Sequence, residues 1–310
     1  MSQITLQPVG LVDAEKRYWG QKISTSSMER FKDLSRAIPP DFQNYLYMMG
    51  GSKYFPSGYR SYNVPAAAKV LFANYKALQD MGEKIDKSVL PAYGRLRERF
   101  HSYATEAHGH YTEVLSLLDI IMADILGNSP SKFADCQNLR VIVEPRTDLS
   151  FRMKDNASGI ITDLLRVNSV LKACIKNINQ SVADLKIFVV FTPEEQRQVD
   201  KMNITGFAEK YVLSKLGFEP LASLTTSRVQ DAINDIAPAI TEMQEELGRW
   251  EAINSDLLAI EDLINEEETT IIEIIATLDN EQILERWMEL GDIVCCEENP
   301  QNDENPDNEE

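Results

Sequence analysis

A stripe of apolar residues between Val229 and Leu278 constrains the fold of this chain more than any other feature. Fourteen residues recur along it at steps of three or four, with one step of seven: Val229, Ile233, Ile236, Ile240, Met243, Leu247, Trp250, Ile253, Leu257, Ile260, Ile264, Ile271, Ile274 and Leu278. This spacing is typical of a coiled-coil-like helix, and the short step from Trp250 to Ile253 would overwind it locally. A helix of about 50 residues is about 75 Å long at about 1.5 Å per residue. Because it cannot bury its stripe alone, other long helices must lie beside it.

Similar stripes predict further helices elsewhere in the chain. Two are long, from about Val89 to Leu126 and from about Gly159 to Val190. Shorter ones are predicted from Ser26 to Ile38, from Ala66 to about Lys84, from Thr192 to Gly217, and after Asn280. The Thr192 start is a capping box with proline at the first helical position, and Pro238 predicts a kink in the C-terminal stripe. The predicted fold is all-α: an elongated antiparallel bundle of about five helices, with long coiled-coil-like rods and a mid-chain head.

Residues 127–156 have the composition of a connection between two long helices. Gly127, Asn128, Pro130 and Pro145 are helix breakers, and Leu139 to Val143 has strand-like composition. Long connections inside compact domains are often functional. We therefore expect this segment to belong to the head.

The predicted domain organisation has three parts. Residues 1–63 form an irregular N-terminal segment that packs on the bundle, residues 64–296 form the bundle with its head at about 111–175, and residues 297–310 form a disordered acidic tail. The N-terminal segment carries a run of aromatic residues from Tyr45 to Tyr62. This run either forms a recognition surface or packs as a loop over the end of the bundle, and the second reading is favoured.

The charge of the chain limits its partners. The net charge is −18, and the tail from Glu297 to Glu310 contributes seven of the acidic residues. This surplus argues against nucleic-acid binding and against constitutive adhesion to anionic lipid. The four cysteines fit neither a disulfide framework nor a zinc pattern, and neither a secretory signal peptide nor an 18-residue apolar run is visible. We expect a protein that is soluble and cytoplasmic when made and is released without a signal peptide.

No constellation of residues points to catalysis. His101 and His108 lie too far apart on one helix for joint metal ligation, and Glu266 to Glu268 reads as a solvated face. Neither a phosphate-binding glycine loop nor a nucleophile motif appears. We therefore predict a protein that is not an enzyme, with no catalytic residue, cofactor or metal.

The second long helix changes character along its length. Up to His110 its outer face is basic and polar, whereas from Val114 onward it is apolar on most sides. The apolar end either lies inside a thicker part of the bundle or is released onto a membrane or a partner. On the second reading, the candidates for membrane insertion are Val114, Leu117, Leu118, Ile120, Ile121, Met122, Ile125, Leu126, Ile160, Ile161, Leu164 and Leu165. The candidates for lining a pore are Asp119, Asp124, Asp163 and Arg166.

Long helical rods, a mid-chain head and a last helix ending in Glu285-Arg286-Trp287-Met288-Glu289-Leu290 give the chain a family resemblance. It resembles the cytolysin-A-type α-helical pore-forming toxins and, because it lacks a 20-residue apolar hairpin, the B component of the binary xenorhabdolysin family. The resemblance implies a soluble monomer that joins an A-type helical component, forms a hetero-oligomeric ring and inserts amphipathic helices into a target-cell membrane. It also places the pore region at about Tyr111 to Ile175.

Two functions follow from these features. The first is one component of a two-part pore-forming cytolysin. The alternative is a non-catalytic helical scaffold or adaptor that acts through coiled-coil contacts, in which the apolar head is simply core.

Overall fold

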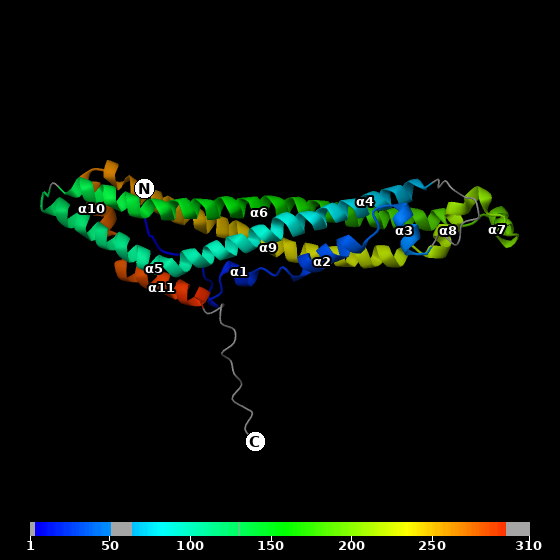
Figure 1. Cartoon of the computed structure of the whole chain (residues 1–310), viewed down its shortest axis with the longest axis horizontal. Helices are drawn as coiled ribbons and strands as arrows, with labels where there is room; N and C mark the ends of the chain where they lie inside the picture. The colour runs from blue at the N-terminus through cyan, green and yellow to red at the C-terminus, as the bar shows by residue number, and fades with distance from the viewer. Residues whose placement is uncertain (1–3, 51–63, 130, 296–310) are drawn as a thin grey trace, which may run out of the picture. The chain divides into compact units, whose positions relative to one another are not determined.

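The structure, a computed structural model, describes residues 4–50, 64–129 and 131–295, and most of these residues are helical (Figure 1). The α-helices are α1 (Trp19–Lys22), α2 (Ser26–Ala37), α3 (Phe42–Met48), α4 (Ala66–Lys84), α5 (Leu90–Leu126), α6 (Lys132–Phe188), α7 (Pro193–Asp200), α8 (Ala208–Leu216), α9 (Glu219–Glu261), α10 (Glu268–Ala276) and α11 (Asn280–Cys295). A π-helical turn, Ile85–Val89, joins α4 to α5. These ranges hold one isolated β-bridge and no strand, so the predicted all-α class is confirmed. The predicted disordered tail and the aromatic residues from Tyr54 to Tyr62 lie outside the described residues.

The chain divides into two compact units. Unit 1 comprises Met1–Ile23, Ala92–Ile161 and Thr241–Glu310, and unit 2 comprises Ser24–Pro91 and Thr162–Ile240. The long helices α5, α6 and α9 therefore contribute residues to both units. The predicted division into residues 1–63, 64–296 and 297–310 stays a prediction.

Aromatic side chains form the centre of unit 1. Trp287 of α11 stacks on Tyr111 of α5 with ring centroids 4.8 Å apart, and Tyr103 packs edge-on against Trp250 of α9 at 5.0 Å. All four are almost completely buried. Figure 1 shows α11 running alongside α5, as these contacts require. Large rings at these positions bury enough apolar surface to hold three helices together.

The core of unit 2 depends on a close approach between α2 and α4. A Cβ atom on Gly82 of α4 would lie 1.8 Å from the Ser35 hydroxyl oxygen of α2, so only glycine fits there. Phe72 of α4 packs against Phe42 and Tyr45 of α3, with ring centroids 5.9 and 5.6 Å apart. α2 confirms the predicted helix from Ser26 to Ile38, and it packs on α4.

The third long helix begins much earlier than the sequence pattern predicts. α6 starts at Lys132 and runs through Pro145, so the predicted connection over 127–156 and the strand-like reading of Leu139 to Val143 are wrong. Leu139, Val143 and Arg146 are buried at helical spacing. The Arg146 guanidinium lies 4.5 Å from the centre of the Tyr103 ring and donates a 2.9 Å hydrogen bond to the Tyr103 carbonyl oxygen. These tertiary contacts stabilise the helix on both sides of the proline, whose missing N–H leaves one helical hydrogen bond unmade.

The C-terminal stripe does not form one continuous rod. α9 continues through Pro238, as predicted, but ends at Glu261, and a 3-10 turn over Asp262–Asn265 precedes α10. The interruption coincides with the seven-residue step in the stripe. Residues 265–267 are exposed there, so none of these three side chains anchors a continuous helix in the core. The predicted helix from Thr192 to Gly217 is likewise divided into α7 and α8, although its capping box at Thr192 and its end at Gly217 are confirmed.

Candidate functional site

The insertion candidates on α5 alternate between the core and the surface of unit 1. Val114, Leu118, Ile121 and Ile125 are buried, Leu117 and Met122 are half-buried, and Ile120 and Leu126 are exposed. Most of the apolar end of α5 is therefore covered by other parts of the chain. The exposed large apolar residues on this end of α5 are Ile120 and Leu126.

The insertion candidates on α6 show the same alternation. Ile160, Ile161 and Leu164 are buried, whereas Leu165 is about half exposed. α6 also exposes Phe133 and Val141, two large apolar residues that the sequence analysis did not single out. The predicted connection over residues 127–156 hides both positions, because a loop has no helical face from which exposure could be inferred.

The four pore-lining candidates are divided between the two units. Asp119 and Asp124 belong to unit 1, and Asp163 and Arg166 belong to unit 2. Asp163 accepts hydrogen bonds of 2.6 Å from both Lys84 and Ser88, so its charge is already paired within unit 2. Asp124 accepts from the Ser131 hydroxyl in the short α5–α6 turn, where a hydrogen bond with Asp124 raises the pKa of Asp135. That turn is thus closed by polar side chains rather than by aliphatic ones.

A second apolar surface lies in unit 2, where α6 ends and α7 and α8 follow. Ile187, Val190 and Met202 are 76, 66 and 83 % exposed, which places them among the most exposed large apolar residues described. Lys210 approaches the rings of Phe188 and Phe191 at 6.0 and 5.5 Å. We call these five apolar residues, with Lys186, Lys201 and Lys210, the α6–α8 surface. The sequence contains no signal for this surface, because periodicity alone does not show which apolar stripe remains uncovered.

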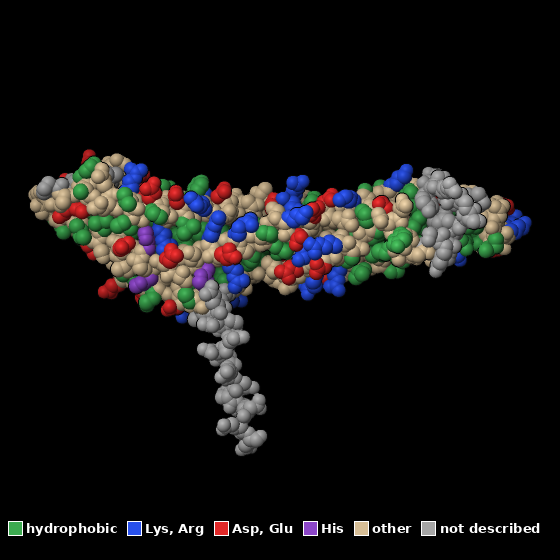
Figure 2. All heavy atoms as spheres, in the orientation of Figure 1, with side chains coloured by type: hydrophobic (Ala, Val, Ile, Leu, Met, Phe, Trp, Pro, Cys, Tyr) green, Lys and Arg blue, Asp and Glu red, His purple; other side chains and the backbone are tan. Residues whose placement is uncertain are grey.

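The local charge at the α6–α8 surface differs from that of the whole chain. Residues 186–217 contain five basic and four acidic side chains, against a net charge of −18 for the protein. Lys186 pairs with Glu219 at 3.0 Å and the mostly buried Lys210 pairs with Glu195 at 2.7 Å, whereas the exposed Lys201 makes no ion pair within the described residues. Exposed aliphatic side chains beside lysine stems fit the boundary between lipid headgroups and acyl chains. Figure 2 shows hydrophobic side chains reaching the surface between charged ones on one face of the molecule.

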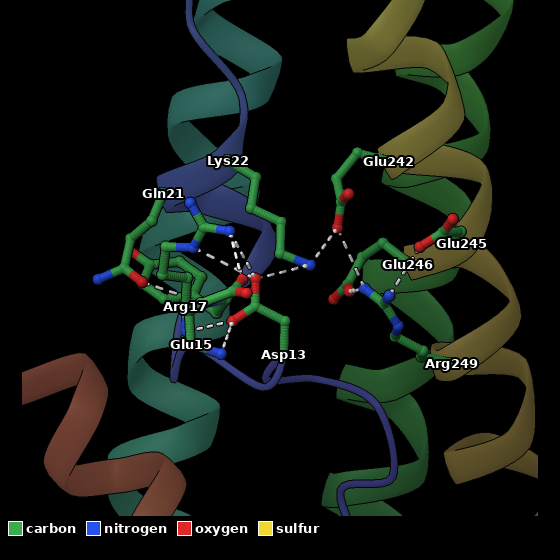
Figure 3. Close-up of polar contacts among 10 residues, drawn as sticks. Asp13, Glu15, Arg17, Gln21, Lys22, Glu242, Glu245, Glu246 and Arg249 are labelled. Atoms are coloured by element: carbon green, nitrogen blue, oxygen red, sulfur yellow. Dashed lines mark hydrogen bonds and ion pairs between the residues drawn. The ribbon is translucent and has the colours of Figure 1, made fainter.

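A polar network ties the N-terminal segment to α9 within unit 1 (Figure 3). The Lys22 ammonium lies 3.2 Å from a Glu242 carboxylate oxygen and 3.6 Å from Asp13. The Arg249 guanidinium lies 3.4 Å from Glu242 and 3.2 Å from Glu246. Both basic groups are mostly shielded from water, so the network fixes the N-terminal segment on α9 more firmly than exposed ion pairs would.

Glu246 is the fully buried member of this network. Burial raises the pKa of Glu246 to about 7, although Arg249 and the Trp250 indole N–H, which donates at 2.5 Å, favour the charged form. Because its pKa is higher in the folded state than in the unfolded chain, the folded state binds more protons between about pH 4.5 and pH 7. The free energy of unfolding therefore falls as the pH rises through this window.

We expect Glu246→Gln to weaken this pH dependence. Glutamine keeps an oxygen acceptor for the Trp250 indole N–H, but its amide group does not titrate in this pH range. A pKa difference of this size changes the free energy of unfolding of the wild type by roughly 3 kcal/mol between pH 4.5 and pH 8. Urea unfolding at pH 5 and pH 8 measures it, with Glu245→Gln as the control because Glu245 pairs with the same arginine from an exposed position. Equal pH profiles for wild type and Glu246→Gln would contradict the assignment.

The structure shows neither a metal cluster nor a membrane-spanning helix in its described part. Across residues 4–50, 64–129 and 131–295, no three histidine, cysteine or carboxylate side chains are placed to hold a metal ion. No helix in these ranges is both long and apolar enough to cross a membrane.

Comparison with known proteins gives structural matches only. No family model matches the chain, and no curated protein matches it. Soluble SmhA of the tripartite α-pore-forming toxin Smh from Serratia marcescens is 13 % identical, with 95 % of this chain and 94 % of that chain covered and a TM-score of 0.44. XaxA from Xenorhabdus nematophila is 10 % identical over 87 % and 93 % of the two chains, with a TM-score of 0.35. Soluble AhlC of the tripartite toxin AHL from Aeromonas hydrophila is 11 % identical over 87 % and 96 %, with a TM-score of 0.30.

The chain resembles components of α-pore-forming toxins. This agrees with the resemblance predicted from the sequence, while the correspondence to a B component stays a prediction.

Proposed function

We propose that the chain is one component of a two-part α-helical pore-forming cytolysin. In this proposal a soluble monomer meets a second, A-type helical component, oligomerises with it in a ring and inserts amphipathic helices into a target-cell membrane. The observation that carries the proposal is the α6–α8 surface, where Ile187, Val190 and Met202 lie exposed beside lysines. Exposed aliphatic side chains in such a setting favour contact with lipid.

The insertion candidates on α5 and the first half of α6 belong to a later step of this proposal. Val114, Leu118 and Ile121 are buried, so they reach lipid only after unit 1 opens. The pore-lining roles of Asp119, Asp124, Asp163 and Arg166 likewise rest on such a rearrangement. The α6–α8 surface needs no opening, and it is therefore the proposed point of first contact.

Leakage from dye-loaded vesicles and lysis of red cells test the proposal. The full chain is added alone and together with each candidate A-type component. Leakage that requires both proteins is the expected result, because each would contribute only part of the ring. Absence of leakage with every pairing contradicts the pore-forming function.

One observation favours the alternative of a helical scaffold or adaptor. Leu118, Ile121 and Ile125 are buried within the single chain, as expected if the apolar end of α5 is core. On this reading the apolar end of α5 is core, and the protein acts through its outer helix faces. A stable soluble complex with a partner, without any binding to vesicles, would support it.

A further inference from the structure

A groove in unit 1 lies between the end of α9 and α10. Its volume is about 510 Å³, and it is lined by Ile4, Ser255, Asp256, Ala259, Asp262, Glu266, Thr270, Glu273, Ile274 and Thr277. Ser255 and Ala259 of α9 and Asp262 of the following 3-10 turn are spaced by four and three. Thr270, Glu273 and Ile274 of α10, with Thr277 at its C-cap, follow at steps of three, one and three. Each helix therefore turns one face towards the groove. Because serine, alanine and threonine supply much of these faces, space is left between the two helices.

The charges around this groove are all of one sign. Asp256, Asp262, Glu266 and Glu273 line it, and no basic side chain does. From Glu251 to Glu285 the chain has eleven acidic residues and no lysine, arginine or histidine. A field of this kind attracts cationic partners and repels anionic lipid.

Three of the four carboxylates are available to a partner. Asp256 is occupied, because one of its oxygens accepts hydrogen bonds from the backbone N–H groups of Thr5 and Leu6, both at 2.9 Å. These bonds fix the N-terminal segment at one side of the groove. Asp262, Glu266 and Glu273 make no ion pair with any basic side chain in the described part of the chain.

We infer that this groove binds a basic amphipathic helix of a partner protein. The apolar face of such a helix would contact Ile4, Ala259 and Ile274, and its lysine or arginine side chains would pair with Asp262, Glu266 and Glu273. Recognition of a helix in a groove by apolar anchors and rim charges is a common mode of binding. A second copy of this acidic chain lacks the complementary charge. The inference rests on the proposed function, because the partner that docks in the groove would be the second, A-type component.

Binding of a synthetic peptide to the full chain tests the inference without a membrane. The probe is a fluorescein-labelled helical peptide made of leucine and lysine, and its counterpart has glutamate in place of lysine. We expect the lysine peptide to bind and the glutamate peptide not to bind. The variant Asp262→Asn/Glu266→Gln/Glu273→Gln is expected to bind about ten-fold more weakly, since rim charge pairs act together.

Two further variants separate a specific site from general attraction to an acidic protein. Glu267→Gln/Glu281→Gln/Glu285→Gln changes the net charge equally, at exposed positions of the same acidic stretch that do not line the groove. We expect it to bind the lysine peptide within about two-fold of wild type, because the groove is intact. Ala259→Trp fills the groove without changing any charge and is expected to abolish binding. Circular dichroism of each variant checks that the helices are retained.

Several outcomes would overturn the inference. Equal weakening by the two triple variants would show attraction to net charge alone. Unchanged binding by Ala259→Trp would place the peptide elsewhere. Self-association of the wild type that the groove variants abolish would show that a second copy of the chain occupies the groove. Vesicle leakage is measured on the same variants: peptide binding at the groove with no leakage under any pairing would contradict the pore-forming function and leave the docking groove standing.

Discussion

Replacing Trp287 by alanine is expected to lower the free energy of unfolding of unit 1 by about 3 to 5 kcal/mol. Trp287 is fully buried, and it stacks on Tyr111 and tilts against Tyr103 with ring centroids 4.8 and 5.6 Å apart. Its indole N–H also donates a 2.8 Å hydrogen bond to the carbonyl oxygen of Leu6. The substitution therefore opens a cavity between α5 and α11 and releases a contact of the N-terminal segment. Urea unfolding followed by near-ultraviolet circular dichroism measures the loss.

Two variants separate the contributions of the ring and of its hydrogen bond. Trp287→Phe keeps an aromatic ring but leaves the Leu6 carbonyl without its donor, which costs about 1 to 3 kcal/mol. Met288→Ala changes the neighbouring residue, which is half exposed, and is expected to stay within about 0.5 kcal/mol of wild type. A Trp287→Ala protein as stable as Met288→Ala would show that α11 is not held by this side chain.

Placing aspartate at both Ile187 and Val190 is expected to weaken binding to vesicles of neutral phosphatidylcholine by about 100-fold. Each substitution removes an exposed aliphatic side chain from the α6–α8 surface and adds a carboxylate that would lose its water on contact with lipid. Because both positions are exposed, the fold is expected to tolerate the change. Sedimentation of the protein with vesicles measures the effect.

A matched variant tests the head predicted from the sequence. Leu126→Asp/Val141→Asp places two aspartates at positions of unit 1 that are 68 and 69 % exposed, so its change in charge and apolar area is comparable. If the α6–α8 surface makes first contact, this variant binds vesicles like wild type. If instead only this variant loses binding, first contact lies in the predicted head. If both variants bind vesicles as strongly as wild type, these exposed apolar residues have no part in membrane contact.

The features that the sequence predicted correctly are those that neighbouring residues decide. The capping box at Thr192 forms as predicted, with the Glu195 carboxylate accepting from the Thr192 N–H at 2.8 Å. The end of α8 at Gly217 is similarly local, because its φ of +66° favours glycine. The stripes through α5 and α9 predicted helices because apolar spacing at three and four residues matches the helical repeat.

Tertiary contacts decided what local patterns could not. Pro145 predicts a break by itself, yet α6 continues because Leu139, Val143 and Arg146 are buried around the proline. Ile121 is buried and Ile187 is exposed, although both are isoleucines on long helices. The sequence by itself thus determined the class of fold and most helix ends, through local capping and periodicity. Only the tertiary structure decided which apolar faces stay uncovered, because exposure depends on neighbours that are distant in the chain.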